Sequence, residues 1–257
     1  MPDRPWKDEY TLLCEKCGYV IEGLDQSGNC PECGKAIADS LPERRVGTPW
    51  QQSPGVGSLV RTWLMTLRHP LRTLDVMRIN EREGTGLALK TLFTAGLWMY
   101  IVICLIEMMN PYSLLGFLGT LGASAIGTPI VIVALIILTT IELSGLIVIS
   151  RSRGFRITEP IADNIVSHGS VGWVWCGAFI ALSLYCYGQS MMPSEELFRL
   201  PPWNAQPNIS GYGLADHYGF MSLIFLLMSI PGFLFFETFA YLGLRRCKYA
   251  NRVRPEP

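Results

Sequence analysis

Four cysteines near the N-terminus have the spacing of a metal-binding site. They form two Cys-x-x-Cys pairs, Cys14 with Cys17 and Cys30 with Cys33, which stand twelve residues apart, and a glycine follows each pair. Four thiolates from two such turns give a tetrahedral all-sulfur site that suits zinc or iron. The sequence therefore predicts that these four residues bind a metal, with zinc favoured and iron as the alternative.

The head that carries these cysteines is too small to fold on an apolar core alone, so we expect metal binding and folding to be one event. The stretch CxxCGYV…CPxCG, within residues 12–37, resembles the rubredoxin-like knuckle that ends rubrerythrins, and zinc ribbons generally. In rubrerythrins the knuckle holds iron and passes electrons to a di-iron centre. This chain lacks the Glu-x-x-His helical pairs that build such a centre. Structural zinc is therefore favoured, and a membrane-tethered electron carrier stays an alternative.

Four apolar segments further along the chain are long enough to cross a bilayer. A hydrocarbon core of about 30 Å needs about 20 apolar residues in a helix. The segments are about 87–109, 129–150, 171–192 and 219–244. The apolar stretch 112–127 is shorter and rich in small residues, which suits a re-entrant or closely packed interfacial helix, with a fifth span as the alternative.

Charge and hydropathy divide the chain into four parts. Residues 1–42 hold eight acidic against four basic residues, residues 43–90 hold eight basic against four acidic ones, and long uncharged stretches follow. We predict a zinc ribbon over 1–42, a linker over 43–57, an amphipathic basic neck helix over 58–83 and a transmembrane domain over 84–257. The fold class expected is an all-α polytopic membrane bundle of four transmembrane helices with amphipathic interfacial helices, joined to a small N-terminal β zinc ribbon.

The positions of lysine and arginine predict the orientation in the membrane. Basic residues precede the first span and follow the second and the fourth, whereas the loops 110–128 and 193–218 together hold one, Arg199. Cytoplasmic loops carry the excess of basic residues, and the first fifty residues have no apolar core of a signal peptide. We therefore expect both termini to be cytoplasmic.

The neck is predicted to lie on the membrane surface. Its apolar residues recur at three- and four-residue spacing, Arg61, Arg68 and Arg72 fall on another face, and Trp63 stands at the apolar boundary. Such a helix suits an anionic leaflet, and packing against the protein's own cytoplasmic ends is the alternative. Pro70 should kink this helix or split it in two.

A second lateral helix is expected after Thr158. This threonine can cap the helix, Pro160 suits its first turn, and Ile157, Ile161 and Ile165 share one face.

Two acidic residues lie inside predicted spans. Glu142 stands nine residues before Arg151 and Glu237 eight before Arg245, so the two carboxyl groups should lie at matched depth. An ionisable residue at such depth is a candidate functional site. The pair predicts either the proton or cation site of a small transporter or a protonated, hydrogen-bonded contact between helices.

Other classes of function find no support in the sequence. There is no Gly-x-Ser-x-Gly, no His-Glu-x-x-His and no phosphate-binding glycine loop, so no catalytic residue is assigned. The acidic head would repel phosphate, which argues against nucleic acid as a partner.

The segment LRHPLRTLDVMRI before the first span resembles bacterial members of the Yip-type family of multi-pass membrane proteins, some of which carry an N-terminal zinc ribbon. The ribbon followed by GTPW resembles proteins of planctomycete-type bacteria. The resemblance implies a bacterial inner membrane, a membrane-organising role and no catalytic residues to carry over. We therefore expect a non-enzymatic protein whose partners are the lipid bilayer and, through the ribbon, a cytoplasmic protein, and self-association stays open.

Overall fold

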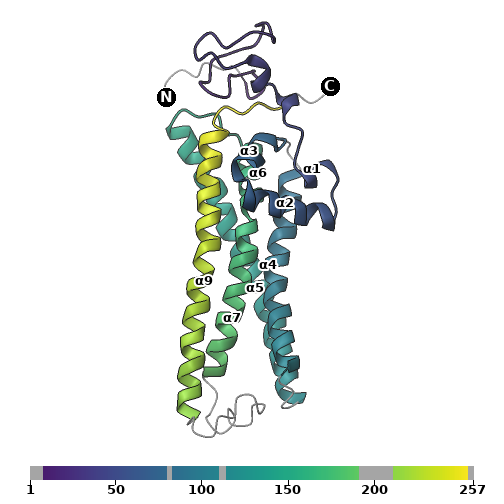
Figure 1. The fold of residues 1–257 in the computed structure, drawn as a ribbon, viewed down its shortest axis with the longest axis vertical. Coiled ribbons are helices and arrows are strands. Elements are labelled where there is room, and N and C mark those ends of the chain that lie inside the picture. The colour runs from purple at the N-terminus through teal and green to yellow at the C-terminus, as the bar shows by residue number, and fades with distance from the viewer. Residues whose placement is uncertain (1–7, 80–82, 110–113, 191–210, 254–257) are drawn as a thin grey trace. The chain divides into compact units, whose positions relative to one another are not determined.

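The structure is a computed structural model that describes residues 8–79, 83–109, 114–190 and 211–253, which are mostly helical. After the ribbon and two 3-10 turns, η1 (Ile37–Ser40) and η2 (Pro42–Arg44), come eight α-helices in the described part of the chain. They are α1 (Pro49–Gln52), α2 (Val56–Arg68), α3 (Pro70–Val76), α4 (Glu83–Met109), α5 (Leu114–Ser152), α6 (Glu159–Gly169), α7 (Val171–Ser190) and α9 (Gly211–Arg246), as Figure 1 shows.

The chain packs as two compact units. The first combines Met1–Lys90, Leu138–Val171 and Phe235–Pro257, and the second combines Thr91–Ile137 with Gly172–Leu234. The first unit therefore holds the ribbon, the neck, α6 and the C-terminal parts of α5 and α9. The second holds most of α4 and α7 together with the N-terminal parts of α5 and α9.

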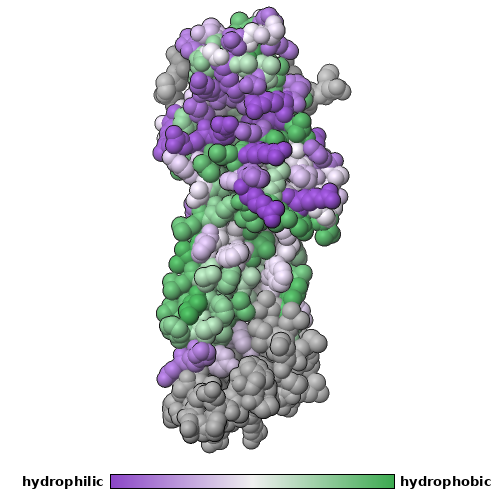
Figure 2. Space-filling view, in the orientation of Figure 1, coloured by the Kyte–Doolittle hydropathy of each residue, from purple (hydrophilic) through white to green (hydrophobic). Residues whose placement is uncertain are grey.

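Three helices in the described residues are long and apolar enough to span a membrane. The candidate spans are Gly127–Ser152 in α5, Val171–Gly188 in α7 and Asp216–Arg246 in α9. Only 11% of the most apolar window of α5 and 17% of that of α9 are buried inside the protein, so their side chains face outward. On the face drawn in Figure 2, hydrophobic residues gather over these helices and hydrophilic ones over the ribbon and the neck. These features support the prediction of an integral membrane protein.

The remaining apolar segments differ in what the structure describes. The predicted first span, 87–109, lies in α4, where the side chains of residues 105–109 are outside the described part. Residues 114–127 form the first turns of α5, which runs without a break through Pro129 to Ser152 over 39 residues. The structure thus joins the stretch predicted as re-entrant or as a fifth span to the second span. Proline is tolerated inside such a helix because neighbouring groups satisfy the freed carbonyl.

The neck is split as the sequence predicts, since α2 ends at Arg68 and Pro70 begins α3. Part of the predicted linker is folded. Trp50 in α1 is buried against Leu59 and Leu87, and the Thr48 N–H donates to the side chain of Gln51 at 3.1 Å. This capping arrangement holds the chain that leads from the ribbon to α2.

The helix expected after Thr158 is confirmed as α6, with Pro160 in its first turn. Ile161 and Ile165 on its apolar face are fully buried. Within the second unit, α7 and α9 are joined by hydrogen bonds to backbone carbonyls. The Trp175 indole donates to Met228 at 2.8 Å and the Ser183 hydroxyl to Ser222 at 2.9 Å.

Candidate metal centre

The four predicted cysteine ligands come together in the folded head. Their sulfur atoms all lie within 4.8 Å of one another. Between the two Cys-x-x-Cys pairs, Cys14 Sγ lies 3.5 Å from Cys33 Sγ, and Cys17 Sγ lies 3.6 Å from Cys30 Sγ. Tetrahedral zinc with bonds of about 2.3 Å separates its sulfurs by about 3.8 Å. The sulfurs therefore fit a tetrahedral ion such as zinc, and iron(II) with four thiolates has the same requirement.

The two Cys-x-x-Cys turns have the same backbone structure. In the first, the Gly18 N–H donates to the Cys14 carbonyl at 2.8 Å, and in the second the Gly34 N–H donates to the Cys30 carbonyl at 2.9 Å. Both glycines have positive φ angles, +84° and +71°, which an L residue with a side chain rarely adopts. The glycine after each pair is thus required by the turn that aims the sulfurs.

The expected β ribbon is only two isolated antiparallel bridges in the described residues, Leu13 with Val20 and Asn29 with Ala36. Each bridge closes one Cys-x-x-Cys turn. The chain does not continue as a pair of strands beyond either bridge. The core of this head is correspondingly small: Ile21 and Ile37 pack with buried Cys14 and Cys30. So small an apolar core agrees with the expectation that metal binding and folding are one event.

The thiols differ in their readiness to lose a proton. Burial raises the pKa of Cys14, but the backbone N–H groups of Cys17 and Lys16 outweigh it and bring this pKa down to about 7. The pKa of Cys17 rises to about 12 through burial and the neighbouring thiols Cys30 and Cys33. A bound cation must displace these protons, so metal binding at this site releases protons.

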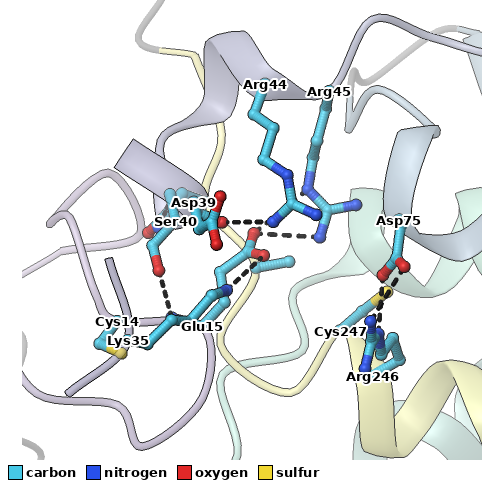
Figure 3. A network of polar contacts seen from close by, with 12 residues as sticks. Cys14, Glu15, Lys35, Asp39, Ser40, Arg44, Arg45, Asp75, Arg246 and Cys247 are labelled. Carbon is cyan, nitrogen blue, oxygen red and sulfur yellow. Dashed lines mark hydrogen bonds and ion pairs between the residues drawn. The ribbon is translucent and has the colours of Figure 1, made fainter. Parts of the chain in front are cut away.

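The residue after Cys14 connects the head to the neck, as Figure 3 shows. Glu15 accepts from the buried guanidinium of Arg45 at 3.0 Å, and Arg45 in turn donates to the Leu74 carbonyl at 2.8 Å at the end of α3. Burial alone would lower the pKa of Arg45, but the Glu15 carboxylate raises it overall. Nearby, Asp75 binds Arg246 at 2.7 Å. Burial opposes ionisation of Asp75, and the bonds from Arg246 still hold its pKa below the usual value.

The other predicted site residues lie elsewhere in the fold. Glu142 in α5 and Glu237 in α9 are half-buried, and both belong to the first unit. Arg61, Arg68 and Arg72 are exposed on the neck.

Trp63 is half-buried, and it packs against the cluster of Trp50, Leu59 and Leu87. Part of the apolar surface of the neck therefore contacts the protein itself, as one of the two predicted alternatives expects, and its arginine side chains are exposed. Contact of the neck with the membrane surface stays a prediction.

Two residues that bind the head from distant parts of the chain have no signal in the sequence. Asn251 and Arg156 are buried and hydrogen-bonded to the ribbon, whereas the sequence shows Arg156 only as one of the basic residues that follow the second predicted span. Asn251 lies 238 residues from its partner Leu13, so no local pattern could reveal it. The capping contact of Thr48 was detectable, because the spacing Thr-x-x-Gln is a helix-start signal.

Comparison with known protein families, characterised proteins and solved structures gives no match for this chain. The geometry of the four cysteines and of the helices therefore carries the functional argument by itself.

Proposed function

We propose that this chain is a non-enzymatic, multi-pass membrane protein whose cytoplasmic zinc ribbon serves as a contact module for another protein. The single observation that carries the proposal is the cluster of four cysteine sulfurs within 4.8 Å of one another, in a chain that also has helices long and apolar enough to cross a bilayer. The membrane part acts as a helical scaffold of the kind that the resemblance to Yip-type proteins implies, with four spans and the bacterial inner membrane as its location.

The outward surface of the ribbon supports a role in protein contact. Tyr19 and Leu24 are both 39% exposed, and the acidic residues beside them, Glu22, Asp25 and Glu32, are exposed as well. A cavity of about 450 Å³ lies next to the metal site. Apolar groups within an acidic surface favour a basic protein partner over phosphate or nucleic acid.

The charge distribution supports a cytoplasmic ribbon. Of the 21 lysine and arginine residues, all but Arg199 belong to the first unit, which also contains the ribbon. Because cytoplasmic segments carry the excess of basic residues, this distribution supports a cytoplasmic side for the ribbon, the neck and the C-terminal tail.

A photo-crosslinking experiment in cells tests the contact module. A photoreactive amino acid at Leu24 should give a discrete protein adduct, and the adduct should disappear when Cys30→Ser removes the metal site. Val46 is exposed outside the ribbon and provides the matched control position. The absence of an adduct at Leu24, or the same adduct at Val46, would contradict the proposed role of the ribbon.

The identity of the metal tests the proposal against the alternative of an electron carrier. Purified protein should contain one zinc per chain and should be colourless, whereas an iron-thiolate site would give a red absorption spectrum. The Cys30→Ser variant should lose the zinc, and Cys186→Ser, a buried cysteine of α7 outside the cluster, should keep it. Elemental analysis alongside the visible spectrum measures both.

A second candidate function is supported by the acidic pair in α5 and α9. Glu142 and Glu237 are half-buried carboxyl groups on two helices of the same compact unit, as expected for a shared proton or cation site in a small transporter. The double variant Glu142→Gln/Glu237→Gln, reconstituted in proteoliposomes, should abolish proton flux if the pair transports. Flux that is absent in the native protein, or unchanged in the variant, leaves the pair as a contact between helices.

A further inference from the structure

The C-terminal tail after α9 holds the metal-binding head through one asparagine side chain. Asn251 accepts from the Leu13 N–H at 2.9 Å and donates to the Leu13 carbonyl at 2.7 Å and to the Ser40 carbonyl at 2.6 Å. Leu13 immediately precedes the ligand Cys14. Ser40 is itself bound to the other side of that ligand, because its hydroxyl accepts from the Glu15 N–H at 3.2 Å. The amide of Asn251 thus fixes the backbone on both sides of Cys14.

A buried arginine from the loop between α5 and α6 completes this arrangement. Arg156 donates to the Thr11 carbonyl in the ribbon, to the Ala250 carbonyl at 3.0 Å and to Asn251 Oδ1 at 2.7 Å. Its side chain therefore joins the ribbon, the loop and the tail. Burial lowers the pKa of Arg156 to about 10, so the group stays charged at neutral pH and its hydrogen bonds are charge-assisted.

An aromatic residue of the tail contacts the glycine that follows the second ligand of the first pair. A Cβ atom added to Gly18, the residue after Cys17, would lie 2.8 Å from the ring of Tyr249. The ring is thus in direct contact with the turn that presents Cys17. Tyr249 is also in edge-to-face contact with Phe155 of the α5–α6 loop, at 6.1 Å between ring centroids.

We propose that the segment Cys247–Val253, called here the clasp, forms part of the wall of the metal centre, and that metal binding and clasp docking stabilise each other. The clasp binds the backbone around the ligand Cys14. That backbone keeps the conformation that the clasp recognises only while the metal holds the four sulfurs together. Groups that orient metal ligands from the second layer typically contribute about 10- to 100-fold to metal affinity. By linkage, the metal strengthens clasp docking by the same factor.

The clasp continues directly from α9, which contains a candidate membrane span. Metal binding in the head therefore affects how the C-terminal end of α9 is held. The Cys247 N–H donates to the Gly243 carbonyl at 2.8 Å and continues the last turn of α9. At the end of α9, Arg246 binds Asp75 of the neck. Loss of metal would release the tail from the head and leave the C-terminal end of α9 held by the neck and by its packing against α6. The inference rests on metal binding by the cysteines and is independent of any protein partner.

A zinc titration of the full-length protein in detergent tests the inference. Competition with a chromogenic chelator gives the zinc affinity of the native chain, of Asn251→Ala and of Val253→Ala. Asn251→Ala should weaken zinc binding about 10- to 100-fold. Val253 lies in the same segment with an exposed side chain, so its variant should stay within about twofold of the native affinity.

Hydrogen exchange of the native chain provides a test without any substitution. Amide protons of the clasp and of Arg156, which donates to the Lys248 carbonyl at 2.8 Å, should exchange faster after zinc removal, whereas those in α7 should not change. The proposal is overturned if the clasp exchanges equally with and without zinc, or if Asn251→Ala binds zinc as tightly as Val253→Ala. Either result would leave the proposed protein contact of the ribbon untouched.

Discussion

At the scale of a single residue, His168 is a base that the fold keeps neutral. It is fully buried, its Nδ1–H donates to the Asn164 carbonyl at 2.7 Å, and its Nε2 accepts from the Thr48 hydroxyl at 3.2 Å. Burial lowers the pKa of His168 to about 4 from a usual value of 6.5. Between these values the unfolded chain binds a proton that the folded chain does not, so stability falls as the pH falls below 6.5.

This residue gives a prediction about acid stability. Between pH 7.5 and pH 5 the protonation of His168 in the unfolded chain should lower the free energy of unfolding by about 2 kcal/mol. His168→Gln has no such proton to bind and should lose correspondingly less stability over this range. Thermal unfolding of zinc-loaded protein in detergent at both pH values measures the difference. Equal losses in both proteins would show that His168 does not contribute.

How far the sequence predicts the site depends on the separation of the residues along the chain. The metal cysteines were predictable because each pair is local and thiolate chemistry restricts its partners. Asn251 and Arg156 were not, since each meets the ribbon only through the tertiary fold and neither has a distinctive neighbouring pattern. The pairing of Glu142 with Glu237 follows from their matched depth in the sequence; the structure places both residues in the first unit, and the shared site stays a prediction.

At the scale of elements, α2 has an exposed apolar stripe next to its buried face. The buried face consists of Leu59, Thr62 and Thr66. The exposed apolar residues recur at steps of three and four and are Val56, Val60, Leu64 and Leu67. The sequence predicts an amphipathic helix here. It does not show which apolar residues are buried in the protein and which stay exposed, because that depends on which side of α2 is covered by α1 and α4.

The stripe predicts insertion of α2 into the membrane interface. A spin label at Leu64→Cys should be accessible to oxygen and shielded from a water-soluble nickel complex. At Val46→Cys, exposed in the segment after the ribbon, the preference should be reversed. The four cysteines outside the metal site are replaced by serine in both proteins. Equal nickel accessibility at the two positions in nanodiscs with anionic lipid would place α2 in water.

Helix packing near the C-terminal end of α9 depends on a glycine. A Cβ atom added to Gly243 would lie 2.4 Å from Ile165 Cγ2, in a fully buried side chain of α6. Gly243→Ala should therefore lower the free energy of unfolding by about 1 to 3 kcal/mol through overpacking.

A second helical glycine provides the control. Gly145 in α5 has no heavy atom within 4 Å of an added Cβ, so Gly145→Ala should be neutral or slightly stabilising because alanine favours helix. Thermal unfolding midpoints of the two variants give the comparison. Equal midpoints would mean that α6 and α9 can separate at this point without cost.

At the scale of the whole molecule, the contact between head and tail limits the number of membrane crossings. Asn251 near one end of the chain is hydrogen-bonded to Leu13 near the other. Two residues in such contact lie on the same side of a bilayer, so the chain between them must cross an even number of times. Three helices in the described residues qualify by length and composition, and α4 is the further helix in which the sequence places a span.

The last prediction follows from this count. Reporters fused before Met1 and after Pro257 should both be active in the cytoplasm, and a reporter inserted between Met109 and Leu114 should be active outside. The basic residues concentrated in the first unit favour the same orientation. A C-terminal reporter on the outside would require an odd number of crossings. The bilayer would then separate Asn251 from the ribbon, and the hydrogen bonds that hold the backbone around Cys14 could not form within one chain.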